Sequence, residues 1–92
     1  MAIGVIWYPP VDKQTYDTIR EKVWQAGQDK GMKFHAAGEA NGVWNIIELW
    51  ESRDGFERFM REDLSRAFNE LGGGQGETPQ PESVFDVYYQ GP

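Results

Sequence analysis

Apolar residues recur along this chain with two different periods, which predict two helices and four strands. Spacings of three and four residues, typical of amphipathic helices, predict helices from Asp12 to about Asp29 and from Ser52 to Leu71. Runs rich in β-branched and aromatic residues predict strands at 2–8, 32–39, 43–51 and 83–89. The apolar stripe of the first helix consists of Tyr16, Ile19, Val23 and Ala26, with Trp24 beside it. The apolar stripe of the second helix consists of Phe56, Phe59, Met60, Leu64, Ala67, Phe68 and Leu71.

Turn and capping residues stand at the ends of these elements. Asn41-Gly42 is the strongest short signal for a hairpin turn, since both central residues of a type I′ turn take positive φ. Asp12 and Ser52 can cap helix N-termini, and Gly31 suits the residue after a helix. The glycine- and proline-rich segment 72–81 predicts a connection that does not pack, too short to link two domains.

The resulting order, βαββαβ, predicts an α+β fold of the ferredoxin-like type as a single domain over 1–92. Right-handed crossovers place both helices on one face of a four-stranded antiparallel sheet. The chain has no further element to cover the other face, so we predict a homodimer closed through the sheet. The alternative is a monomer in which the second face of the sheet is exposed to solvent.

Composition excludes several classes of function. The net charge of −6 disfavours nucleic-acid and membrane partners, which need clustered lysine and arginine. The sequence contains no cysteine, so disulfides and thiolate metal sites are ruled out. The chain starts with a strand-like run and has no long apolar segment, and we therefore expect a cytoplasmic protein.

Two short segments resemble a known family. Trp50-Glu51-Ser52 closes the third predicted strand and Phe56-Glu57-Arg58-Phe59 opens the second helix. With the order of elements, this resembles the antibiotic biosynthesis monooxygenase superfamily of dimeric α+β barrels. The resemblance implies the fold and the dimer. It also implies a range of activities: cofactor-independent oxidoreductases that form quinones, haem-degrading monooxygenases, polyketide cyclases, and relatives without known activity.

A two-residue turn at Asn41-Gly42 sets the register of the central hairpin. Counting from it places His35 opposite Glu48, and Lys33 opposite Trp50. Side chains alternate between faces, so the two sets can be listed. One face holds His35, Ala37, Trp44, Ile46, Glu48 and Trp50, and the other holds Phe34, Ala36, Val43, Asn45, Ile47 and Leu49. The first set predicts an amphipathic pocket for a flat aromatic molecule, and the second the surface shared with a partner subunit.

His35 and Glu48 are the predicted catalytic residues. A carboxylate beside an imidazole orients it and raises its basicity, which suits a general base acting on an acidic phenol or ketone. The structural alternative is an ordinary cross-strand polar pair. Trp44, Trp50, Trp7, Tyr8 and Phe59 are the candidates for substrate binding, and Trp50 has a packing role as its alternative.

No cofactor is predicted. One histidine and no cysteine leave no convincing metal site. In the haem-degrading relatives the second helix carries a tryptophan and, ten residues on, a histidine; here these positions hold Phe59 and Asn69. The family resemblance therefore implies a cofactor-independent monooxygenase, acting on a planar aromatic or polyketide-like substrate. A non-redox cyclase or isomerase and a ligand-binding or structural dimer remain as alternatives.

Overall fold

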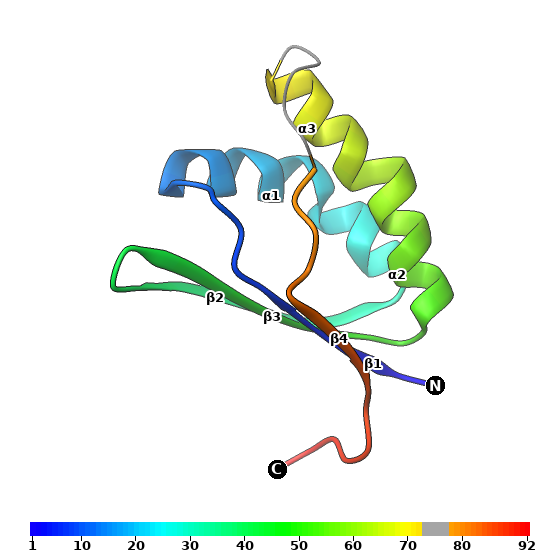
Figure 1. Cartoon of the computed structure of the whole chain (residues 1–92). Coiled ribbons are helices and arrows are strands. Elements are labelled where there is room, and N and C mark those ends of the chain that lie inside the picture. Colours follow the sequence, from blue (N-terminus) through cyan, green and yellow to red (C-terminus); the bar gives the residue numbers. More distant parts are fainter. Residues whose placement is uncertain (73–77) are drawn as a thin grey trace.

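The computed structural model describes residues 1–72 and 78–92. Its elements are β1 (Ile3–Trp7), α1 (Lys13–Asp29), β2 (Met32–Ala40), β3 (Val43–Trp50), α2 (Arg53–Phe59), the π-helical segment η1 (Met60–Leu64), α3 (Ser65–Gly72) and β4 (Ser83–Asp86). All strand pairs are antiparallel, and the sheet order is β2-β3-β1-β4. Both helical segments lie on one face of the sheet (Figure 1). The α+β ferredoxin-like fold predicted from the sequence is confirmed.

Local signals in the sequence account for the element boundaries. Asp12 accepts a hydrogen bond from the Thr15 N–H at 2.8 Å, and Ser52 accepts one from Gly55 at 3.1 Å, so both predicted caps are present. The hairpin turn has φ values of 53° at Asn41 and 80° at Gly42. Strand β4 is three residues shorter than predicted, and Tyr88 and Tyr89 are exposed beyond its end. Most of the predicted glycine-rich connection, residues 73–77, lies outside the described residues.

The hairpin register follows the predicted count except at its far end. His35 pairs with Glu48 and Glu39 with Trp44, as expected. Trp50, however, pairs with Met32 and not with Lys33, because the ladder is irregular between Met32 and Phe34. The pairing predicted between Lys33 and Trp50 is therefore wrong.

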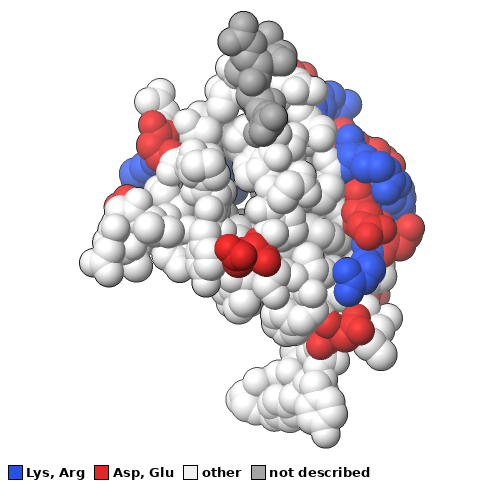
Figure 2. Space-filling model, viewed as in Figure 1, with Lys and Arg blue, Asp and Glu red and all other residues white. Residues whose placement is uncertain are grey.

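The core lies between the helices and the inner face of the sheet. Strand β1 contributes Ile3, Val5 and Trp7, and Trp50 is fully buried beside them. The ring of Phe56 packs edge-on against both Trp7 and Trp50, at centroid distances of 6.1 and 5.4 Å. On the outer side of the helical layer, away from the sheet, arginine alternates with aspartate or glutamate along α2 and α3 (Figure 2). That face is solvated, and Arg58–Glu62 is one of its ion pairs.

A π-helical turn interrupts the second helix. Segment η1 contains two buried residues, Asp63 and Leu64. Asp63 is 8% exposed and its carboxylate lies 2.8 Å from the Lys30 ammonium, just after the end of α1. This ion pair raises the pKa of Lys30 and ties the two helical segments together.

Gly55 is required where α2 begins. A Cβ atom built there would lie 2.1 Å from the backbone oxygen of Lys30. We expect Gly55→Ala to lower the free energy of unfolding by about 1–3 kcal/mol, since backbone must move to make room. Denaturant unfolding measures this loss. Gly38→Ala is the matched control, because a Cβ there meets nothing within 4 Å; equal losses in the two variants would contradict the steric explanation.

None of the helices in 1–72 and 78–92 combines the length and the hydropathy that a membrane span needs.

Candidate functional site

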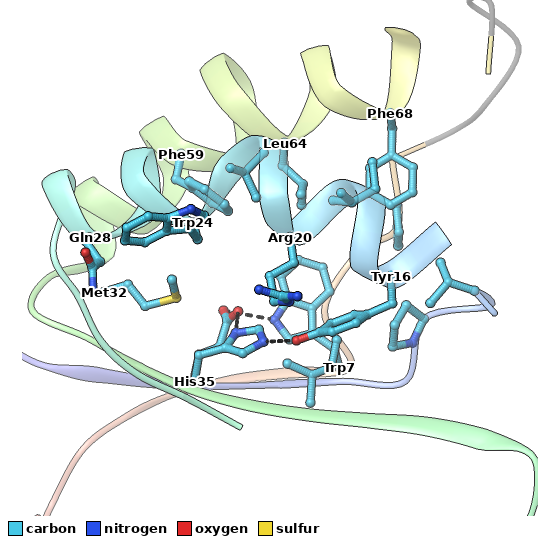
Figure 3. Close-up of a pocket in the computed structure, with 17 residues that line it drawn as sticks. Trp7, Tyr16, Arg20, Trp24, Gln28, Met32, His35, Phe59, Leu64 and Phe68 are labelled. Carbon is cyan, nitrogen blue, oxygen red and sulfur yellow. Dashed lines mark hydrogen bonds and ion pairs between the residues drawn. The ribbon is translucent and has the colours of Figure 1, made fainter. Parts of the chain in front are cut away.

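A cavity of about 220 Å³ lies between the inner face of the sheet and the helices. Helix α1 forms one wall, with Tyr16, Arg20, Trp24 and Gln28 in a row at spacing four. The sheet supplies Trp7, Met32, His35, Ile46 and Glu48, and the second helical segment supplies Phe59, Leu64 and Phe68. Figure 3 shows these side chains around one space, with the polar groups of Tyr16, His35 and Arg20 gathered at its base. The lining is otherwise mostly apolar.

Three side chains form a hydrogen-bonded relay along one wall of this cavity. The Tyr16 hydroxyl lies 2.6 Å from His35 Nε2, and His35 Nδ1 lies 2.8 Å from Glu48 Oε2. The other carboxylate oxygen, Oε1, accepts hydrogen bonds from the indole N–H groups of Trp7 at 3.1 Å and Trp50 at 3.0 Å. Glu48 is only 6% exposed, so the relay ends on a buried carboxylate with all its partners in place.

The partners of Glu48 fix where the protons lie. An indole N–H can only donate, and an ionised carboxylate can only accept. Ionised Glu48 therefore requires His35 Nδ1 to carry a hydrogen, which leaves Nε2 with its lone pair in the neutral ring. Tyr16 then donates its hydroxyl proton to Nε2. We assign the relay as Tyr16 O–H to His35 to Glu48, with the negative charge at the buried end.

The hydroxyl of Tyr16 is neutral across the ordinary pH range. Burial raises its pKa above the usual value; Arg20 opposes this rise, and the charges of Glu48 and Asp17 add to it. A folded-state pKa above that of the unfolded chain means that stability is complete below about pH 10 and falls as pH rises through the folded-state pKa.

Tyr16 should consequently be the last of the chain's four tyrosines to ionise. Tyr8, Tyr88 and Tyr89 are exposed, whereas Tyr16 is bonded inside the fold. We expect an alkaline titration followed by tyrosinate absorbance to show a late component that Tyr16→Phe removes and Tyr8→Phe leaves in place. Loss of the late component in the Tyr8 variant would contradict this assignment.

The structure brings some of the predicted site residues together and separates others. His35, Glu48, Trp7 and Phe59 line the cavity. Trp50 is fully buried and serves as a donor to Glu48. The remaining two lie outside the lining: Trp44 stacks on the outer side of the Tyr16 ring at 4.9 Å, and Tyr8 is half exposed beyond the end of β1.

Sequence reasoning placed Tyr16 only in the core stripe and did not consider Arg20. Both belong to the same α1 row as Trp24 and Gln28, which a helical count from Tyr16 in steps of four would have found. That count, however, does not show which strand residues face the row. The pairing of Tyr16 with His35 is known only once α1 is packed on the sheet.

The described residues do not fit a haem or a metal ion. His35 is the chain's one histidine, and both of its ring nitrogens are already hydrogen-bonded. Where the haem-degrading enzymes of the family it resembles carry a second-helix histidine, this chain has Asn69 by residue count, and neither Asn69 nor the next residue, Glu70, is a histidine; both are exposed. Within 1–72 and 78–92, histidine, aspartate and glutamate side chains form no cluster of three suited to a metal. A cavity of 220 Å³ is also below the usual range of pockets that hold large ligands, about 300–1,000 Å³.

Comparison with known proteins finds a likeness among solved structures. No model of a known protein family matches the chain, and no curated protein matches it. Among solved structures, it is similar to a mutant of MhuD with two manganese protoporphyrin IX molecules bound per active site. The two chains share 13% sequence identity with a TM-score of 0.49, over 99% of this chain and 96% of the other.

Proposed function

We propose that this protein is an enzyme that removes a proton from a small, planar, weakly acidic organic molecule. The observation that carries this proposal is the relay from Tyr16 through His35 to the buried carboxylate of Glu48, which opens on an apolar cavity. A purely structural polar pair would need neither the third member nor an adjoining space. General acid–base groups arranged in this way contribute about 10²–10⁴-fold to the rate of proton transfer.

The geometry supports a specific path for the proton. A substrate in the cavity meets the Tyr16 oxygen, because Nε2 of His35 is already occupied by the tyrosine hydroxyl. As the tyrosine oxygen takes the substrate's proton, its own proton passes to Nε2. The imidazolium formed lies 2.8 Å from the Glu48 carboxylate, which stabilises its charge. The proton thus moves without leaving an uncompensated charge in the relay.

Aromatic side chains support this step in two ways. Trp7 and Phe59 are buried walls of the cavity against which a flat ring can lie. Trp44 stacks on Tyr16 and limits its movement, so it is a positioning residue. Trp50 holds the Glu48 oxygen that does not face His35.

Two kinds of reaction begin with this proton removal. In a cofactor-independent monooxygenase, to which the sequence bears a resemblance, the substrate anion gives its electrons to dioxygen and the product is a quinone and water. In a cyclase or isomerase, the same anion attacks a carbonyl within the substrate or is reprotonated elsewhere. The monooxygenase is our first proposal, supported by the resemblance, and the non-redox enzyme is the second.

Exchange of a carbon-bound proton in heavy water tests the shared first step. We expect the protein to accelerate exchange in small aromatic ketones, followed by NMR, and Tyr16→Phe to abolish the acceleration. Tyr8→Phe is the control, since Tyr8 lies outside the cavity. An oxygen electrode then separates the two reactions: uptake that depends on substrate supports the monooxygenase. If such compounds bind but their protons do not exchange faster, both the monooxygenase and the non-redox enzyme are contradicted. The protein would then be a ligand-binding protein.

A further inference from the structure

Arg20 occupies a place in the cavity that the proton relay does not use. It follows Tyr16 by one helical turn on α1, and its guanidinium points from the helix into the cavity (Figure 3). Its nearest ion-pair partner is Asp17 at 3.9 Å, on the solvent side of the helix, and both side chains are nearly half exposed. This contact is long and solvated, so it holds the guanidinium only weakly.

The charged groups of the cavity indicate a role for Arg20 in binding an anion. Glu48 is the lining carboxylate, and its oxygens are taken up by two indoles and the imidazole. Among the described lining residues, Arg20 supplies the permanent positive charge. When the relay accepts a proton, the substrate is left as an anion in mostly apolar surroundings. A guanidinium with several N–H donors is well suited to bind the oxygen on which that charge collects.

The size of the cavity limits what this anion can be. An apolar cavity of about 150 Å³ is enough to bind benzene. The present cavity of about 220 Å³ accommodates one aromatic ring with one or two small substituents. Three fused rings occupy far more volume than benzene, and the cavity is less than twice the size of one that binds benzene.

We infer that Arg20 binds the oxyanion produced in the cavity, and that the ligands of this site are single-ring phenols or enols whose oxygen lies between Arg20 and Tyr16. This inference deepens the proposed function and rests on it for the origin of the anion. It narrows the substrate class from planar aromatic molecules in general to one-ring compounds with an acidic hydroxyl or keto group.

The probe is 4-nitrophenol, whose ionised form absorbs visible light. Bound to the wild-type protein, it should ionise about one pH unit lower than in water, which is about tenfold more phenolate relative to phenol at a given pH. Arg20→Gln should abolish this shift, and Arg20→Lys should keep part of it, since lysine retains the charge without the fork of donors. Arg61→Gln is the control, because Arg61 is exposed on η1 and does not line this cavity.

The outcomes separate this inference from the proposed function. If 4-nitrophenol binds without a change in its pKa, or if the change survives in Arg20→Gln, Arg20 does not bind the anion. The proposed function is then still tested separately, by the proton-exchange experiment. Failure of 4-nitrophenol to bind, or tighter binding of a three-ring phenol, overturns the one-ring class. A shift that depends on Arg20 in a protein with no exchange activity supports the anion site and counts against the enzyme.

Discussion

Replacing Glu48 by glutamine should leave the protein folded and lower its turnover by about 10⁴-fold. The glutamine oxygen can still accept from the indoles of Trp7 and Trp50, but its NH2 group then faces His35 Nδ1. Two N–H groups cannot bond, so the imidazole changes tautomer and carries its hydrogen on Nε2. In that form it donates to Tyr16 and cannot take its proton. A tautomer imposed in the same way on a catalytic triad lowers kcat by roughly 10⁴.

Glu48→Ala separates the chemical effect from the structural one. It removes the acceptor of three donors, two of them on fully or nearly buried tryptophans. Each unsatisfied buried donor costs about 1–3 kcal/mol, so we expect a loss of at least 2 kcal/mol in the free energy of unfolding. Denaturant unfolding of both variants, beside turnover of Glu48→Gln, makes the comparison. Wild-type turnover in Glu48→Gln would show that the relay is not used in catalysis.

Introducing a charge on the outer face of the sheet should convert a dimer into monomers. This face carries four large apolar side chains that are each 42–49% exposed: Phe34, Val43, Ile47 and Phe85. An exposed apolar area of this kind is typical of an interface, and a two-fold pair would bury it. Ile47→Asp would place an unpaired charge at its centre, which costs several kcal/mol when buried.

Sedimentation of the wild-type protein at micromolar concentration should therefore give twice the mass of the chain. Sedimentation of Ile47→Asp should give the mass of a single chain. Gln14→Asp is the control, since it adds the same charge on the exposed start of α1. A monomeric wild-type protein, or an unchanged dimer in Ile47→Asp, would contradict closure through this face.

The central hairpin was predictable because one tight turn determines its register. Asn41 and Gly42 adopt the positive φ values that these two residue types tolerate, and the period of two then carries the register back to His35 and Glu48. The count fails only past the irregularity before Phe34. A strand irregularity leaves no distinct residue type in the sequence, so the wrong pairing of Lys33 could not be avoided.

The remaining parts of the site depend on contacts between elements that no turn connects. Trp7 reaches Glu48 because β1 lies beside β3, yet the chain between these strands runs through α1 and β2. Tyr16 reaches His35 because of the way α1 lies across the sheet. The sequence shows which face each residue occupies, but the position of one face against another comes from packing of the whole core.

The π-helical turn in η1 has a consequence for how this chain is aligned with other proteins. Such a turn takes in one extra residue while the helix advances, so equal numbers of residues no longer mean equal distances along the axis. In an uninterrupted α-helix, a fixed distance along the axis is covered in ten residues; with the extra residue of the π-helical turn, the same distance takes eleven. Counted from Phe59, the position that ten residues would reach in a regular α-helix is therefore held here by Glu70 and not by Asn69. Alignments of this helix with regular α-helical counterparts therefore need a one-residue gap within 60–64, and motifs defined by fixed spacing across it will be missed.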